Sequence, residues 1–519
     1  MRYLISLLLA GTFALAPLMP SHADEAAAAG KASPEQHHGT HDDAKPPATE
    51  NTTRTQHSVS IGGHTIKYTA TAGTLIIRDD KNQPQASVFY VAYTVDTGKP
   101  EKRPLTFLYN GGPGSSSMWL HMGSFAPVRI ETASPAATAP PPYHLVPNSD
   151  SLLDKTDLVF IDAVGAGYSR PLGKATGKDF WGVDQDISAF TRAIQRYVSV
   201  NQRWNSPKFL YGESYGTTRS AALVDALQDK GMTFNGVILM SSILNYGVRI
   251  PGYDEVYIGY LPSYAAAAWY HNKIPNKPAD LKSYLDQVRA WASGPYAAAL
   301  AQGQNLPAAQ LDAVAQQLAA YTGLSVAYVK EANLRVDPSR FRKELLRDQR
   351  LTLGRYDSRF TGTDPDAAGE NPDYDASDTG ISGAFVGAFH NYMDQQLNYH
   401  SDLDYRPTYG EINKNWDWKH KAAGVRRPLP LAYVAGDLAH AMRTNPNLKV
   451  LSVNGYYDFA TPFFITEYDL AHMNLDPSLR DNLQFVYYPS GHMIYLNTDA
   501  LKQLKTDLSR FYDHAAPQR

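Results

Sequence analysis

The chain has no cysteine among its 519 residues. This absence excludes disulfide bonds, thiolate nucleophiles and cysteine-ligated metal sites. Any covalent nucleophile must therefore attack through oxygen or nitrogen. The fold must also be stable without cross-links, and a chain of this length with 43% hydrophobic residues can bury a large core.

An excess of basic residues is also lacking, since 48 Lys and Arg face 51 Asp and Glu and the net charge is -3. Nucleic acids and anionic membranes are bound by basic surfaces, so we expect neither as a partner. A peptide or small molecule is the better expectation. Beyond the first 23 residues there is no run of about 18 apolar residues, so no membrane span is expected in the mature protein.

Residues 1–23 have the pattern of an export signal. Arg2 provides the positive start, residues 4–18 are apolar, and SHA at 21–23 is a small-x-small cleavage pattern. We expect cleavage after Ala23 and a periplasmic or secreted protein. A retained N-terminal anchor is the alternative.

Residues 24–56 are rich in Ala, Pro, Thr and His and nearly free of large apolar side chains. Such a composition cannot bury enough surface to offset the entropy of ordering, so we expect a disordered linker. Its His37, His38 and His41 could bind a transition metal weakly, although a plain polar tail is the favoured interpretation.

Compact apolar runs that end in turn residues follow the linker. They include LTFLYN at 105–110, DLVFIDAV at 157–164, KFLYG at 208–212 and NGVILMSS at 235–242. Such runs are typical of buried strands in a largely parallel sheet. Residues 179–201 have apolar positions at helical spacing, and 64–95 alternate as two or three antiparallel strands would. The pattern predicts an α/β fold, with a central, mostly parallel sheet and helices on both faces.

GESYG at 212–216 has the form G-x-S-x-G, between an apolar strand and a helical segment. A sharp strand-to-helix turn strains the serine backbone, and only glycine two residues to either side leaves room for it. Ser214 should therefore stand exposed at the sheet edge, on a helix N-terminus that favours developing negative charge.

A serine needs a base, and this kind of turn finds its partners later in the chain in the order Ser, Asp, His. Asp458 comes just after the apolar run LKVLSVNG, and His492 lies in the loop after LQFVYY. Both therefore lie beyond the carboxyl ends of expected strands, where α/β sheets assemble their sites. His440 and His472 are the nearest competitors, but neither follows a strand.

NGGPG at 110–114 must end its strand, because Pro113 cannot donate to a ladder and glycine weakens one. Glycine also lets backbone approach a reacting group closely. We expect two N–H groups to hold the oxyanion of a tetrahedral intermediate, those of Gly112 and Tyr215.

Together, NGGPGSSS, FIDAVGAGYSR, GESYG, NGYYDFATP and SGHMIYL, in this order across residues 105–505, resemble the serine carboxypeptidase family of α/β-hydrolases, particularly its bacterial exported branch. The resemblance implies an exported enzyme without a cofactor or metal that hydrolyses C-terminal peptide bonds through an acyl-enzyme. It implies the catalytic triad Ser214, Asp458 and His492, the oxyanion hole Gly112 and Tyr215, and the binding of the substrate's terminal carboxylate by Asn110 and Glu213.

A carboxylate at Glu213 would repel that of the substrate unless it is protonated, so this family should prefer acid. Two departures from the family are visible. Ser115 replaces a usual cysteine, and Ala126 and Pro127 stand where many members carry a glutamate that pairs with the residue at Glu213. The strength of the acid preference and strict exopeptidase behaviour therefore stay open.

Residues 248–425 interrupt the strand and helix alternation with Ala-, Gln- and Tyr-rich helical stretches. We expect a single helical cap that sets substrate choice, inserted between two parts of the core at 57–247 and 426–519. Two alternatives remain for the function. The same triad could serve an esterase or acyltransferase, or the fold could belong to a catalytically silent binding protein.

Overall fold

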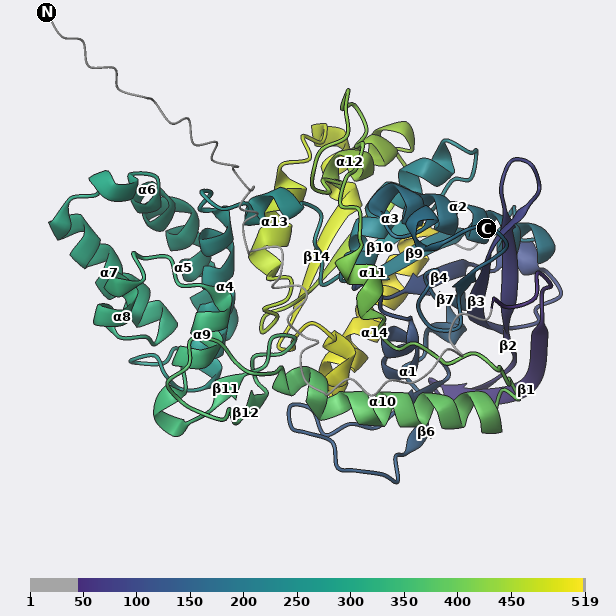
Figure 1. The fold of residues 1–519 in the computed structure, drawn as a ribbon, viewed down its shortest axis with the longest axis horizontal. Helices are drawn as coiled ribbons and strands as arrows, with labels where there is room; N and C mark the ends of the chain where they lie inside the picture. Colours follow the sequence, from purple (N-terminus) through teal and green to yellow (C-terminus); the bar gives the residue numbers. More distant parts are fainter. Residues whose placement is uncertain (1–44, 517–519) are drawn as a thin grey trace, which may run out of the picture.

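A computed structural model describes residues 45–516, which are built around a ten-stranded sheet with the order β1-β2-β3-β7-β4-β9-β10-β13-β14, where β8 pairs with β3 (Figure 1). The strands of the sheet are β1 (Thr52–Ile61), β2 (His64–Arg78), β3 (Pro84–Thr94), β4 (Leu105–Tyr109), β7 (Asp157–Ile161), β8 (Arg170–Pro171), β9 (Lys208–Glu213), β10 (Gly236–Met240), β13 (Lys449–Gly455) and β14 (Leu483–Tyr488). Two short hairpins lie apart from it, β5 (Val128–Ile130) with β6 (Leu145–Pro147) and β11 (Thr352–Leu353) with β12 (Thr361–Gly362).

The sheet is mixed. Strands β1, β2 and β3 are antiparallel and β3 is antiparallel to β7, whereas the neighbours from β7 through β4, β9, β10 and β13 to β14 are parallel. Every residue of β4, β7 and β10 is buried, as expected for strands that are covered on both faces. The predicted α/β class with a largely parallel centre is confirmed.

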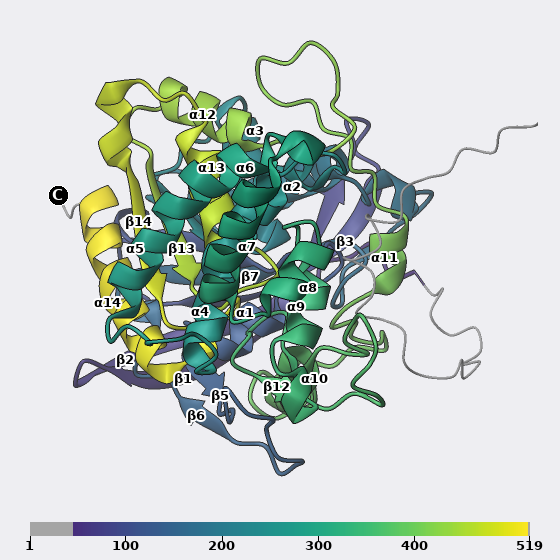
Figure 2. The same ribbon diagram turned by 90° about the vertical axis from the view of Figure 1, so that its left-hand side faces the viewer.

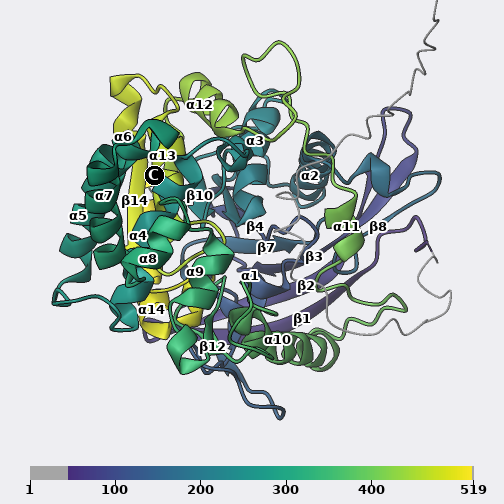
Figure 3. The ribbon, with the colours of Figure 1, turned by 60° about the vertical axis from the view of Figure 1, so that its left-hand side comes forward.

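Helices cover both faces of the sheet, and alternate side chains of a strand enter different cores. In β4, Phe107 belongs to one core and Leu108 to the other. The core of Phe107 is shared with α2 (Val183–Val200), α3 (Tyr215–Gln228) and α12 (Ala435–Thr444). The core of Leu108 is shared with α1 (Met118–Gly123), α10 (Ala376–Gln395) and α14 (Thr498–Ala515). Figure 3 shows α10 and the group of α2, α3 and α12 on opposite sides of the sheet.

The long connection from β10 to β13 contains a helical lobe. Its helices are α4 (Glu255–Tyr270), α5 (Leu281–Trp291), α6 (Ala297–Leu300), α7 (Ala308–Thr322), α8 (Val326–Glu331) and α9 (Pro338–Glu344). The lobe has a third hydrophobic core, which continues into Tyr456, Tyr457 and Phe459 after β13 and into α13 (Phe463–Ala471). Seen from its own side, the lobe lies in front of the sheet (Figure 2).

The predicted single cap at 248–425 is divided in two by the structure. Helices α4 to α9 form the lobe, but α10 packs on the face of the sheet because its Phe385 and Phe389 share a core with α1. The short helix α11 (Gly410–Lys414) lies against the opposite core through Ile412. The interrupted alternation of strands and helices in the sequence therefore indicated an insertion, but it did not indicate that the insertion is divided between the lobe and the faces of the sheet.

Order also begins earlier than predicted. Strand β1 starts at Thr52, which pairs with Gly73 of β2. The predicted linker at 24–56 therefore wrongly includes the first residues of this strand. The polar composition of 52–56 was misleading because an edge strand is held by its backbone and leaves alternate side chains exposed. The export signal, its cleavage site and His37, His38 and His41 lie outside the described residues.

Between residues 45 and 516, no helix combines the length and the apolar character needed to cross a membrane. The same part of the chain contains no cluster of three or more His, Asp or Glu side chains that could hold a metal ion.

Candidate active site

Ser214 occupies the predicted sharp turn between β9 and α3, with φ 61° and ψ -131°. The two flanking glycines are needed for close packing. A Cβ on Gly212 would lie 2.1 Å from the carbonyl oxygen of Gly216, and one on Gly216 would lie 2.8 Å from that of Tyr109. The turn thus holds the serine at the carboxyl edge of the sheet and at the first turn of a helix, as the motif predicted.

The NGGPG loop after β4 lies directly against this helix terminus. A Cβ on Gly111 would be 2.3 Å from the backbone nitrogen of Tyr215, and Gly112 has φ 102°, which favours glycine. The N–H of Tyr215 is in the first turn of α3 and has no carbonyl partner within the helix. The two N–H groups predicted to hold an oxyanion therefore belong to backbone segments in contact with each other.

A buried ion pair anchors this loop. The Arg219 guanidinium donates to the carbonyl oxygen of Asn110 at 2.8 Å and to Asp186 Oδ2 at 2.7 Å, and it lies 4.1 Å from the ring centre of Phe190. Arg219 and Asp186 are both buried. Sequence reasoning missed this pair, because residues separated by 33 positions give no local signal of contact.

Replacing Arg219 with leucine should lower the free energy of unfolding by about 3 to 5 kcal/mol, because Asp186 would be left as an uncompensated buried charge. Chemical denaturation measures the loss. The control is Arg196→Leu, which breaks a more exposed pair with Glu50 and should cost less than about 1 kcal/mol. Equal losses in the two variants would show that the buried pair does not stabilise the fold.

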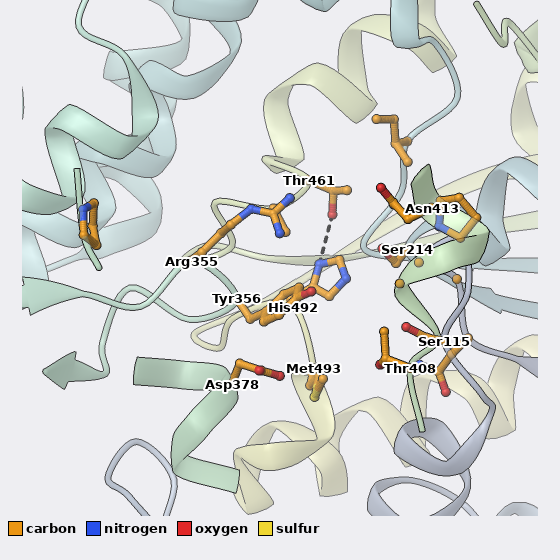
Figure 4. Close-up of a pocket in the computed structure, with 18 of the residues that line it drawn as sticks. Ser115, Ser214, Arg355, Tyr356, Asp378, Thr408, Asn413, Thr461, His492 and Met493 are labelled. Atoms are coloured by element: carbon orange, nitrogen blue, oxygen red, sulfur yellow. Dashed lines mark hydrogen bonds between the residues drawn. The ribbon is translucent and has the colours of Figure 1, made fainter. Parts of the chain in front are cut away.

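His492 and Asp458 form a buried pair, with 2.7 Å between His492 Nδ1 and Asp458 Oδ2. The second oxygen, Oδ1, accepts the N–H groups of Ala460 at 2.7 Å and Thr461 at 2.9 Å, so the carboxylate is fixed in orientation. The Thr461 hydroxyl lies 2.8 Å from Asp458 Oδ2 and 3.1 Å from His492 Nδ1 (Figure 4). Threonine three residues after the aspartate was not singled out from the sequence.

The backbone of His492 is held on both sides. Its N–H donates to the carbonyl oxygen of Tyr356 at 2.6 Å, and its carbonyl accepts the Ser241 hydroxyl at 2.6 Å. The ring of Tyr356 lies 5.2 Å from the imidazole. Burial opposes the charged form of His492, but Asp458 and Glu213 outweigh it and raise its pKa. Tyr356 comes from the inserted segment, which the sequence linked only to substrate choice.

Ser214 and His492 line one cavity of about 1000 Å³. The predicted residues in its wall are Asn110, Gly112, Glu213, Ser214 and His492. Asp458 and Tyr215 are buried behind this wall, where Asp458 contacts His492 and Tyr215 follows Ser214. The competing histidines pair elsewhere, His440 with Asp225 and His472 with the carbonyl oxygen of Tyr468.

Glu213 is buried at the cavity wall, and its Oε2 has no hydrogen-bond partner among the described residues. Burial raises its pKa to about 7, although His492 and, more weakly, Tyr495 and Asn110 lower it. Asn110 Oδ1 accepts the N–H of Leu120 at 2.8 Å, so the amide NH₂ is the donor end of that side chain, and it hydrogen-bonds Glu213. A carboxyl that is protonated below about pH 7 and an amide donor therefore lie beside Ser214.

Tyr495 is the neighbour of Glu213 that the sequence did not indicate. It is fully buried, and its ring occupies the space beside Gly123, where a Cβ would lie 2.4 Å from the ring. The Tyr495 phenol lies beside Glu213 and lowers its pKa, and Ala126 and Pro127 supply no carboxylate.

The sheet order, the serine turn and the histidine after the last strand define an α/β-hydrolase. Residues 65–362 match the family model of the serine carboxypeptidases. The chain therefore belongs to the serine carboxypeptidase family and is a serine-type hydrolase, as its motifs predicted.

Among solved structures, a prohormone-processing carboxypeptidase from Saccharomyces cerevisiae is similar, with a TM-score of 0.52, 15% identity and coverage of 86% of this chain and 91% of that one. This likeness shows the fold. A proline iminopeptidase from Mycobacterium smegmatis matches with a TM-score of 0.36 and 13% identity over 89% of this chain and 99% of that one. Comparison with curated protein sequences gives no match.

Proposed function

We propose that the protein is an exported carboxypeptidase that removes C-terminal residues from peptides, with Ser214, His492 and Asp458 as its catalytic triad. The observation that carries this proposal is a cavity lined by Ser214, His492 and the buried carboxyl of Glu213, whose pKa burial raises to about 7. A neutral carboxyl can donate a hydrogen bond to the terminal carboxylate of a peptide, which an ionised one would repel.

In the proposed reaction, Ser214 Oγ attacks the carbonyl carbon of the last peptide bond while His492 Nε2 takes the hydroxyl proton. The N–H groups of Gly112 and Tyr215 hold the resulting oxyanion. His492 then gives its proton to the departing amine, the C–N bond breaks, and an acyl-enzyme remains. Water, deprotonated by His492, attacks the acyl carbon. The bond between that carbon and Ser214 Oγ then breaks, His492 returns the proton to Oγ, and the shortened peptide is released.

Asn110 and Glu213 select the substrate in this proposal. Asn110 offers its amide NH₂ and Glu213 its carboxyl proton to the two oxygens of the terminal carboxylate. Release of a C-terminal amino acid from an N-blocked dipeptide tests the function, with the C-terminal amide as the comparison. Hydrolysis of blocked esters without any release from free-acid dipeptides would instead assign the triad to an esterase.

Export is proposed from the pattern of residues 1–23. N-terminal sequencing of the protein recovered from the producing cell tests it. Asp24 as the first residue supports export, and an intact Met1 would contradict it.

The peptidase activity of the wild type should fall as the pH rises through about 7, the pKa of Glu213. Replacing Glu213 with glutamine should remove this fall. The wild-type group is protonated and donates below that pH, whereas glutamine donates at every pH. Since Glu213 also raises the pKa of His492, the variant should begin to gain activity at a lower pH, where the imidazole becomes neutral. Profiles of kcat/KM against pH for a free-acid dipeptide measure both limbs.

The corresponding C-terminal amide is the control for this experiment. It carries no terminal charge, so its profile should lack the alkaline limb in the wild type and in Glu213→Gln alike. Identical pH profiles of kcat/KM for the free acid and the amide in the wild type would mean that Glu213 does not bind the terminal carboxylate.

A further inference from the structure

Two arginines, Arg249 and Arg355, line the cavity. Arg249 ends the short helix η6 (Tyr246–Arg249), and its Nη2 donates to the carbonyl oxygen of Ala460 at 2.8 Å. The carbonyl oxygen of Arg355 accepts the N–H of Phe459 at 3.0 Å. Both arginines are thus attached to the turn that follows Asp458, and Figure 4 shows the Arg355 guanidinium turned toward Thr461.

Neither guanidinium forms an ion pair within residues 45–516. Several buried cations are paired, as Arg203 is with Asp157, Arg359 with Asp357 and Lys343 with Asp364, whereas the buried Lys208 is held by backbone carbonyl oxygens. Arg249 Nε is buried and has no hydrogen-bond partner there. A buried donor without an acceptor is costly, and the guanidinium also keeps a positive charge at the cavity wall that attracts an anion.

The acidic side chains nearby in the described part of the chain form no ion pair with either guanidinium, although the charges of Asp375 and Asp458 act on Arg355, and that of Arg249 acts on Asp469. Asp375 Oδ1 accepts the backbone N–H of Arg355 at 2.9 Å and forms no ion pair with its guanidinium. Asp378 also lines the cavity, and burial raises its pKa to about 6 although Arg355 lowers it. Burial raises the pKa of Tyr246 to about 12, while the charges of Arg249, Arg219 and Arg355 lower it.

The order of the strands determines which part of a substrate meets these arginines. Ser214 follows β9. Asn110 follows β4, the neighbour of β9 on one side, whereas Arg249 and Thr461 follow β10 and β13, which lie on the other side. If Asn110 and Glu213 hold the terminal carboxylate, the departing residue occupies the β4 side. The acyl portion then extends over the β10 and β13 side, toward the arginines.

We propose that Arg249 and Arg355 form a subsite for a carboxylate side chain, so that the protein prefers peptides with Asp or Glu as the penultimate residue. The proposal rests on the proposed function, which fixes the direction of the peptide. A guanidinium matches a carboxylate in planar geometry and in charge, and the pair of arginines gives it more than one donor.

The test compares kcat/KM for N-blocked dipeptides that share one C-terminal residue and carry Glu, Gln or Leu before it. The wild type should prefer Glu over Gln by about 10- to 100-fold, because Gln lacks the charge but keeps the shape. Arg355→Met should bring the Glu-to-Gln ratio close to one, and Arg249→Met should lower it. This ratio is insensitive to a general loss of activity, so partial damage by a substitution does not imitate the result.

Arg335→Met is the matched control, because it removes an arginine of the same insertion that is paired with Asp254. It should keep the wild-type ratio. A wild-type ratio near one would overturn the proposal. A second result would also overturn it. If Arg355→Met lowered kcat/KM for free-acid dipeptides more than for their C-terminal amides, whatever the penultimate residue, the arginines would bind the terminal carboxylate instead.

Esters of N-blocked Glu and Gln separate this proposal from the proposed function. They place the same side chains in the acyl portion without needing a terminal carboxylate. A preference for the Glu ester that depends on Arg355 would support the subsite even if no dipeptide were hydrolysed.

Discussion

Replacing Ser214 with alanine should lower kcat by about a million-fold while the protein stays folded, because the serine and histidine of such a site act as one unit. Alanine keeps the Cβ that the turn already accommodates at φ 61°, so the backbone strain is the same in both forms. Turnover of an N-blocked dipeptide and of a blocked ester measures the loss. Circular dichroism checks the fold.

A fluorophosphonate probe makes this prediction independent of substrate choice. The wild type should be labelled at Ser214 and the alanine variant should not. A variant that retains activity within about a hundred-fold of the wild type would assign the nucleophile elsewhere. An unlabelled, inactive wild type would favour the catalytically silent binding protein.

Replacing Asp458 with asparagine should lower kcat by about 10⁴-fold with little change in structure. The reason lies in the fixed donors of Ala460 and Thr461, which face Oδ1 of the wild-type carboxylate. The amide oxygen of asparagine should turn toward these two N–H groups and present its NH₂ to His492 Nδ1. The imidazole would then hold its proton on Nε2 and could not accept one from Ser214.

The pair of Asp225 and His440 provides the control. It also joins an aspartate oxygen to a histidine Nδ1, at 2.6 Å, but it lies on α3 and α12 and does not include His492. Asp225→Asn should leave kcat unchanged. In Asp458→Asn the remaining activity should also begin at a lower pH, since Asp458 raises the pKa of His492. A loss below about tenfold would mean that Asp458 does not orient the histidine.

The sequence predicted the parts of this site that depend on local geometry. Ser214 is marked by glycines on both sides, whose role the close contacts of Gly212 and Gly216 explain. Asp458 and His492 follow strands of the parallel part of the sheet, so their place at its carboxyl edge follows from the topology. These signals are short-range or are set by the order of the elements, and one sequence is enough to find them.

The parts that were missed depend on contacts between distant segments. Tyr356 and Arg355 belong to a loop of the insertion, and nothing in their neighbouring residues indicates that the loop reaches His492. Tyr495 has no local signal that separates it from the many tyrosines of the chain. Thr52 was assigned to the linker because its strand is held by backbone pairing, which composition does not report.

The carbonyl oxygen of Tyr356 has a consequence for how this protein could change in evolution or in the laboratory. The inserted segment supplies one of the supports of His492, and its lobe shares a hydrophobic core with Tyr457 and Phe459 on either side of Asp458. A chimera that took its whole inserted segment from another hydrolase would lose that support along with the old specificity. New specificities are therefore easier to reach by substitutions at the cavity wall, such as Arg249 and Arg355, than by exchange of the whole inserted segment.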